Sequence, residues 1–133
     1  HAQLPDDTLL IPMDMDKLQQ ALLNIIKNAM ESIEKEGEIT ITAAMDEKNL
    51  FRIAITDTGC GMTWEEVEKI FNLEYTTKEK GLGLGLALAH EMIHGHGGEI
   101  RVWSQKNKGT TFEIFLMKAR GQGKTKITET EEK

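Results

Sequence analysis

The sequence of 133 residues lacks the features that mark several special classes of protein. No apolar run approaches the roughly 20 residues of a membrane-spanning helix. Only 16 Lys and Arg stand against 22 Asp and Glu, and a net charge of −6 argues against binding to a nucleic-acid backbone. The single cysteine, Cys60, cannot form an internal disulfide or a cysteine-based zinc site, and we expect it to lie in a turn. These absences predict an ordinary soluble domain of the cytoplasm.

The two ends of the chain carry little structural signal. The N-terminus, HAQLPDDTLL, has neither the basic start nor the apolar segment of a signal peptide. From residue 119 onward the chain is polar and charged, which is typical of a disordered segment. We therefore expect one folded domain over residues 1–118 and a disordered tail over residues 119–133, with no internal repeat.

Between these ends, segments with the hydrophobic period of a helix alternate with segments that have the period of two typical of strands. Residues 8–13 predict a short edge strand, because their proline would interrupt a central ladder. A long amphipathic helix follows, capped by Asp14 or Asp16 and stopped by Gly37. The later elements are expected as strands over 38–45 and 50–57, short helix 63–71, helix 84–94, and strands 99–104 and 111–117. The pattern predicts an α+β, two-layer sandwich, with a mixed five-stranded sheet and about three helices on one face.

Two amides stand out on the long helix. Asn24 and Asn28 are four residues apart, so their side chains share one face beside the apolar stripe. Asn is a poor residue for a helix interior, and its neutral oxygen suits a hard cation such as Mg²⁺ that is shared with phosphates. The alternative is a pair of solvated amides.

A carboxylate is expected on the buried side of the sheet. Asp57 shares the period of the apolar residues in its strand, and Thr110 does so in the last strand. Asp57 could close an Asx-type turn over the following residues, or it could accept the exocyclic amine of a purine. Gly59 and Gly61 would allow a flat ring to approach the backbone closely.

A second glycine-rich stretch precedes the 84–94 helix. Gly81, Gly83 and Gly85 lead into its N-terminus, where free N–H groups attract anions, and Lys78 and Lys80 add positive charge. The spacing matches neither a Walker loop nor a Rossmann fingerprint. By itself this glycine pattern predicts a phosphate-binding loop only weakly.

The same helix carries HEMIH, which fits the H-E-x-x-H pattern of zinc peptidases. A catalytic zinc site needs a third protein ligand, and the extended motif would place it at position 100, which is Ile100. We therefore interpret His90 and His94 as residues of a packed helix, and His96 as a helix-end residue.

Taken in order, five stretches resemble the catalytic, ATP-binding domain of bacterial sensor histidine kinases, within the wider group that includes gyrase and Hsp90. DKLQQALLNIIKNAMESI resembles the N box and DTGCGM the first glycine box. IFNLEYTTK resembles the phenylalanine box, GLGLGLALAHEMIHGHGG the second glycine box, and GTTFEIFL the final strand. The resemblance runs from about Leu10 to Leu116, and the sequence of the helical segments is most similar to that of nitrogen-regulation and sporulation kinases. It implies a Bergerat fold.

The resemblance implies a role for each matching residue. Asn28 would hold Mg²⁺, Asn24 would lie beside the phosphates, and Lys78 would assist them, so these three form the implied catalytic set. Asp57 would take the adenine amine, helped by Thr110 through water. The other implied nucleotide contacts are Lys27, Gly59, Gly61, Met62, Phe71, Tyr75, Thr76, Thr77, Gly81, Leu82, Gly83, Leu84, Gly85 and Leu86. Of these, Phe71 and residues 75–77 would belong to a short ATP lid.

The implied function is half of an enzyme. The domain would bind Mg-ATP and donate the γ-phosphate to a histidine on a separate dimerisation and phosphoacceptor domain of the same protein, which then serves a response regulator. His90 and Glu91 match the start of a phosphoacceptor motif, but the next residues do not continue it, so no substrate histidine is expected here. We expect the isolated domain to be a monomer and the full-length protein a homodimer, with membrane anchoring left open.

Three alternatives remain open at this point. A stand-alone ATPase, or a serine kinase of the anti-sigma type, would share the fold but would favour a general-base Glu in place of Asn24. A degenerate docking module would keep the fold without binding nucleotide. A zinc hydrolase is the third.

Overall fold

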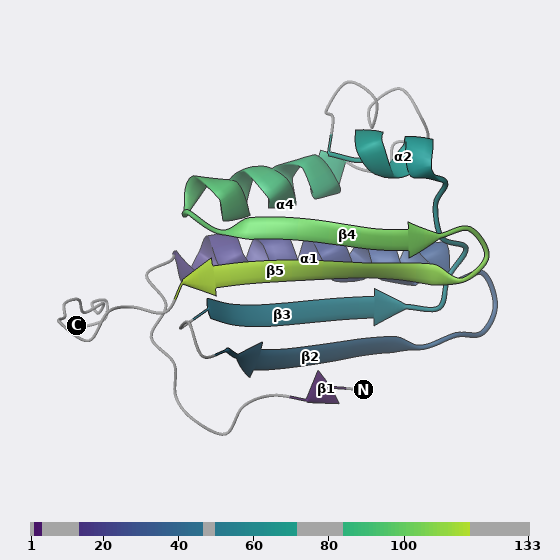
Figure 1. Ribbon diagram of the computed structural model, residues 1–133, viewed down its shortest axis with the longest axis horizontal. Coiled ribbons are helices and arrows are strands. Elements are labelled where there is room, and N and C mark those ends of the chain that lie inside the picture. Colours follow the sequence, from purple (N-terminus) through teal and green to yellow (C-terminus); the bar gives the residue numbers. More distant parts are fainter. Residues whose placement is uncertain (1, 4–13, 47–49, 72–83, 118–133) are drawn as a thin grey trace, which may run out of the picture.

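The computed structural model describes residues 2–3, 14–46, 50–71 and 84–117 (Figure 1). The helices in this part are α1 (Met15–Ser32), α2 (Trp64–Lys69) and α4 (Leu84–Gly95). The strands are β1 (Ala2–Gln3), β2 (Ile39–Met45), β3 (Leu50–Asp57), β4 (Glu99–Gln105) and β5 (Gly109–Met117). None of the described helices is both long and apolar enough to cross a membrane.

The strands form one mixed sheet in the order β1-β2-β3-β5-β4. Four strands of seven to nine residues are antiparallel to their neighbours, and the two-residue β1 pairs in parallel with β2 at the edge. The two predicted hairpins are confirmed. The edge strand expected at 8–13 lies outside the described residues, and the described edge strand occupies Ala2–Gln3, where none was predicted.

Helix α1 lies behind the sheet in Figure 1, and α4, which is drawn above β4, packs against both α1 and β4. They confirm the predicted two-layer arrangement, while the short α2 lies near β4 and has no buried residue. The core between the layers is apolar because the helical stripes and the alternate strand residues face one another. Its fully buried side chains include Ile25, Ala29, Ile93, Phe112 and Ile114.

Helix α1 begins as the sequence predicted but ends earlier. The side chain of Asp14 accepts hydrogen bonds from the backbone of the first turn, which identifies it as the N-cap. The expected stop at Gly37 is wrong, because the helix ends at Ser32. The hydroxyl of Ser32 donates to the carbonyl of Ala29 at 2.8 Å, and Ile33 is already extended. A side-chain bond of this kind competes with the helix ladder.

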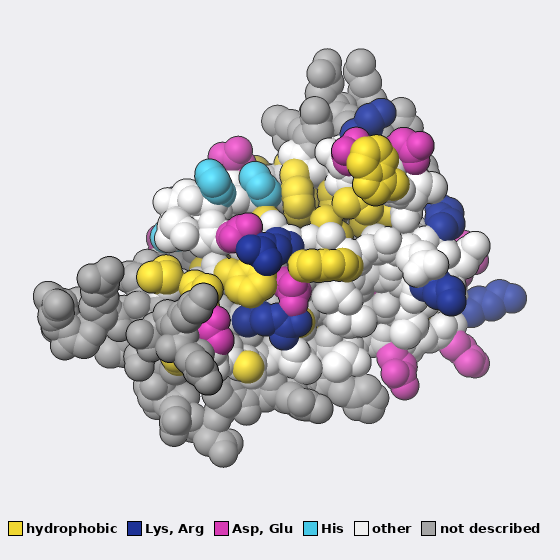
Figure 2. Space-filling model, in the orientation of Figure 1, with side chains coloured by type: hydrophobic (Ala, Val, Ile, Leu, Met, Phe, Trp, Pro, Cys, Tyr) yellow, Lys and Arg dark blue, Asp and Glu magenta, His cyan; other side chains and the backbone are white. Residues whose placement is uncertain are grey.

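The other face of the sheet, called here the outer face, carries no described helix. Figure 2 views this face, on which charged and hydrophobic side chains lie next to one another. Arg52 forms an ion pair with Glu113, and Arg101 lies over the ring of Phe115 at 4.9 Å. Trp103 is 53% exposed there. The polar residues of the helix-covered face are fewer and more deeply buried.

Candidate functional site

Three polar side chains form a row across the helix-covered face of the sheet. Asp57 on β3 is the cross-strand partner of Thr110 on β5, and Thr110 is the partner of Ser104 on β4. Partners in register point to the same face, so the three side chains lie next to one another. Asp57 is 2% exposed and Thr110 is 5% exposed. The predicted inward orientation of both residues is confirmed.

The two carboxylate oxygens of Asp57 have different surroundings. Oδ1 accepts a hydrogen bond from the backbone N–H of Gly59 at 2.8 Å, which closes the Asx-type turn. Oδ2 is buried and has no hydrogen-bond partner among the described residues. Leaving a buried acceptor without a donor costs about 1–3 kcal/mol, and more when the group is charged. The turn therefore uses one oxygen and leaves the other available to a ligand that can donate a hydrogen.

Ser104 was missed by the sequence analysis, although its position two residues after Val102 gives it the inward period of β4. Its hydroxyl accepts from the backbone N–H of Met62 at 2.8 Å and donates to the carbonyl of Gly109 at 3.1 Å. It also lies 2.7 Å from the hydroxyl of Thr110. Ser104 thus connects the glycine-rich turn to the row that contains Asp57.

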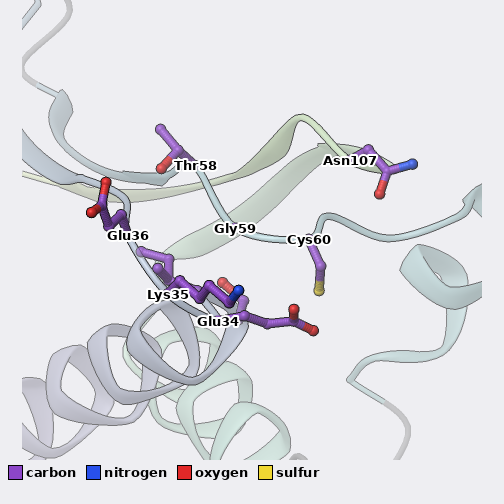
Figure 3. Close-up of a pocket in the computed structure, with 9 residues that line it drawn as sticks. Glu34, Lys35, Glu36, Thr58, Gly59, Cys60 and Asn107 are labelled. Atoms are coloured by element: carbon purple, nitrogen blue, oxygen red, sulfur yellow. The ribbon is translucent and has the colours of Figure 1, made fainter.

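The glycine-rich turn after Asp57 is held from two sides. The backbone N–H of Cys60 donates to the carbonyl of Ser32 at the end of α1, at 2.9 Å, and the N–H of Asn107 donates to the carbonyl of Cys60, at 2.6 Å. Figure 3 shows the turn running between α1 and the segment that carries Asn107. A hollow of about 340 Å³ lies here, but Asp57 does not line it. These bonds fix the start and the direction of the loop beside Asp57, and Cys60 lies in a turn as expected.

Both glycines of this turn have a packing reason inside the protein. A Cβ atom on Gly59 would lie 2.6 Å from the carbonyl oxygen of Ser32. Gly61 has a φ of +69°, and a Cβ there would overlap with the carbonyl oxygen of Gln105. Their expected approach to a flat ring stays a prediction, because the atoms that they approach here belong to the chain itself.

The amides of α1 border the first turn of α4. A Cβ on Gly85 would lie 3.4 Å from Cγ of Asn24, and the Oδ1 atom of Asn24 accepts from the side chain of Gln20 at 3.1 Å. Asn28 is half-buried and its side-chain amide makes no hydrogen bond to another described residue, whereas Lys27 is exposed. The structure therefore brings Asn24 next to the start of the second glycine box, and it leaves the amide of Asn28 available to a ligand.

Three of the expected nucleotide contacts belong to the apolar core or its margin. Leu86 is buried among core residues, and Met62 packs against them while remaining half-buried. Phe71 lies with its ring centroid 6.4 Å from that of Phe112, edge to face. These positions anchor the segments that flank residues 72–83.

The HEMIH histidines make ring contacts. His90 stacks on Phe71 with a centroid distance of 4.7 Å, and His94 stacks on His90 at 5.7 Å. The Nδ1 atom of His96 lies 2.8 Å from the carbonyl oxygen of Met92, at the end of α4. No group of three or more His, Cys, Asp or Glu side chains suited to a metal ion occurs within residues 2–3, 14–46, 50–71 and 84–117. The rings of this motif pack on one another and on Phe71.

Several expected site residues fall outside the described part of the chain. These are Tyr75, Thr76, Thr77, Lys78, Gly81, Leu82 and Gly83. Leu84 is the first residue of α4. The roles of all of these residues stay predictions.

Comparisons with known proteins agree with this geometry. Residues 13–120 match the family described as histidine kinase-, DNA gyrase B- and HSP90-like ATPase. Sensor histidine kinase ZraS of Escherichia coli K12 is 42% identical over 106 residues, covering 80% of this chain and 23% of that protein. Sensor histidine kinase WalK of Bacillus subtilis is 40% identical, covering 85% of this chain and 20% of the relative. The chain thus spans about a fifth of the length of these relatives.

Solved structures give the same assignment. The catalytic domain of histidine kinase ThkA superimposes with a TM-score of 0.76 at 30% identity, covering 88% of this chain and 78% of that one. Full-length ShkA, in complex with AMPPNP, gives a TM-score of 0.75 at 27% identity and covers 89% of this chain and 25% of that one. The chain belongs to the histidine kinase-, DNA gyrase B- and HSP90-like ATPases, and its sequence and fold are those of a two-component sensor kinase ATPase domain.

Proposed function

We propose that this chain binds Mg-ATP and donates the γ-phosphate to a histidine on a separate dimerisation and phosphoacceptor domain of the same protein. The phosphate would then pass to a response regulator. The observation that carries the proposal is the Oδ2 atom of Asp57, which is buried and has no partner in the described part of the chain. An acceptor in this state favours a donor such as the exocyclic amine of adenine.

The phosphates of the nucleotide would lie between α1 and the start of α4. Asn28, whose amide is half-buried, would contribute a neutral oxygen to Mg²⁺, a hard cation that prefers oxygen ligands. Bound Mg²⁺ would neutralise charge on the phosphates of the nucleotide. Asn24 lies against Gly85 at the start of α4, where the free N–H groups of a helix N-terminus attract phosphate. Lys78 would add positive charge. The structure of full-length ShkA, which is in complex with AMPPNP, supports a nucleotide at this fold.

The chain should transfer phosphate only when the acceptor histidine is supplied. Asn24 stands where ATP-hydrolysing relatives carry a general-base Glu, and an amide cannot take a proton from water. Positioning and charge stabilisation of the transferring phosphoryl group would therefore be the main contributions of this domain. We expect a weak ATPase, and no autophosphorylation by the chain alone.

Calorimetric titration of the chain with ADP, and with a non-hydrolysable ATP analogue, tests the proposal with and without Mg²⁺. We expect saturable one-to-one binding that is tighter with Mg²⁺. Absence of binding in both conditions would favour the degenerate docking module. Radiolabel from ATP on His90, His94 or His96 of the isolated chain would contradict the assignment of the acceptor to another domain.

A further inference from the structure

The hydroxyl of Ser104 has three polar neighbours at hydrogen-bond distance, but it has only one hydrogen to donate. The backbone N–H of Met62 can only donate, so Ser104 accepts from it at 2.8 Å. The carbonyl of Gly109 can only accept, so Ser104 gives its hydrogen there, at 3.1 Å. The third contact, 2.7 Å to Oγ1 of Thr110, is then a hydrogen bond only if Thr110 is the donor. One arrangement alone satisfies all three contacts.

This arrangement directs the hydroxyl hydrogen of Thr110 towards β4, away from β3. Thr110 and Asp57 are cross-strand partners, and such partners have Cβ atoms about 4.5–5.5 Å apart, so a change of rotamer at Thr110 would bring its hydroxyl to the carboxylate of Asp57. Within the described residues, Oδ2 of Asp57 nonetheless has no donor. The hydroxyl of Thr110 lies 2.7 Å from that of Ser104 and is not in bonding geometry with this oxygen, so its oxygen atom is held on the β4 side of the row.

We infer that Ser104 is a positioning residue, which keeps the hydroxyl hydrogen of Thr110 on itself and thereby leaves Oδ2 of Asp57 free for the adenine amine. This inference rests on the proposed function. Asp57 and Thr110 then both present acceptor lone pairs to the ligand. A base that offers a donor at this point, as adenine does with its amino group, fits such a row, whereas a carbonyl acceptor would be repelled.

Replacing Ser104 by Ala removes the acceptor for the Thr110 proton. The freed hydroxyl is expected to rotate and donate to Oδ2 of Asp57, where it competes with the ligand. We expect S104A to weaken ADP binding by roughly threefold to tenfold, the size of one net hydrogen bond. S104T keeps a hydroxyl at the same atom and should bind ADP within about twofold of the unchanged chain.

A double-mutant cycle separates this role from simple loosening of the glycine-rich turn, since S104A also removes the acceptor for the N–H of Met62. ADP affinity is measured by calorimetry for S104A, T110V and the double variant. If Ser104 acts through the Thr110 hydroxyl, S104A adds less than about twofold to T110V. Thr111→Val is the matched control, because it deletes a strand hydroxyl on the outer face, where Thr111 pairs with Thr56 at 3.0 Å.

The outcomes are distinct. Unchanged ADP affinity in S104A, or an equal loss with and without the Thr110 hydroxyl, would overturn the positioning role. A loss of the same size in T111V would attribute the effect to the sheet in general and would overturn it as well. Failure of the unchanged chain to bind ADP would refute the proposed function, whereas binding without coupling between positions 104 and 110 would refute this inference alone.

Discussion

Each face of the sheet carries a cross-strand pair of polar residues, and the two pairs differ in whether their polar atoms find hydrogen-bond partners. On the outer face, Thr56 and Thr111 pair with each other through their hydroxyls at 3.0 Å. The next pair in the register, Asp57 and Thr110, lies on the helix-covered face, and Oδ2 of Asp57 stays unpartnered within the described residues. The two pairs occupy opposite sides of the same two strands, and only the inner pair contains a carboxylate.

This difference in hydrogen bonding indicates which face of the sheet is expected to bind a ligand. A polar group on the outer face has a protein partner or access to water, as the 53% exposure of the nearby Trp103 illustrates. A carboxylate oxygen under the helices has neither, and its desolvation is offset only when a donor arrives. We therefore propose the ligand site on the helix-covered side of the sheet, where Oδ2 of Asp57 has no partner among the described residues.

The largest loss of stability is expected from a substitution at Gly109, where β5 begins next to the backbone of Asp57. Gly109 begins β5 with a φ of +120°, and a Cβ there would overlap with the carbonyl oxygen of Asp57. We expect Gly109→Ala to lower the free energy of unfolding by about 2–4 kcal/mol, because it combines an unfavourable φ with overpacking between β3 and β5. Urea titration followed by circular dichroism measures this loss.

Gly97 provides the matched control for that variant. Its φ of +79° is also left-handed, but among the described residues other than its chain neighbours no atom lies within 4 Å of a Cβ placed there. Gly97→Ala should therefore cost only about 1–2 kcal/mol, the conformational part alone. Equal losses in the two variants would show that the close approach of β5 to Asp57 does not matter for stability.

A second change should affect the helix-covered face alone. Asp57→Asn keeps the oxygen that accepts from Gly59 but places an amide donor where Oδ2 stood. The side-chain amide at position 57 and the exocyclic amine of adenine are both donors and would face each other in the complex. We therefore expect ADP affinity to fall by roughly 10- to 100-fold. Calorimetry measures the affinity, and a thermal melt checks that the fold persists. Retention of full affinity would remove the main support for a purine site.

The smallest effect is expected on the outer face. Arg52 and Glu113 form an ion pair in which the side chains are 40% and 13% exposed. Arg52→Ala should cost about 0.5–1 kcal/mol of stability, the range of partly exposed pairs, and should leave ADP affinity unchanged. Glu99→Gln, which breaks the more exposed pair with Arg101, serves as the control and should cost less. A loss of ADP affinity in Arg52→Ala would contradict the division of roles between the two faces.

Much of the architecture was predictable because it depends on local pattern. The period of two in residues 50–57 placed Asp57 inside, and the short helix expected over 63–71 is confirmed as α2, with Thr63 as its N-cap. The end of α1 was predicted five residues too late, at Gly37 in place of Ser32. The stop there involves the carbonyl of Ser32, which is bonded to Cys60 on a loop that lies far along the chain. No local pattern reports such a contact.

The candidate site likewise has features that the sequence predicted and features that it did not. The sequence by itself determined which side chains point inward, since alternation in a strand is set by backbone geometry and by the need to bury apolar residues. Only the tertiary structure decided that Asp57, Thr110 and Ser104 form one row, and that one carboxylate oxygen is satisfied while the other is not. Register and strand order arise from pairing between distant segments, and the direction of a hydroxyl proton depends on every neighbour that surrounds it.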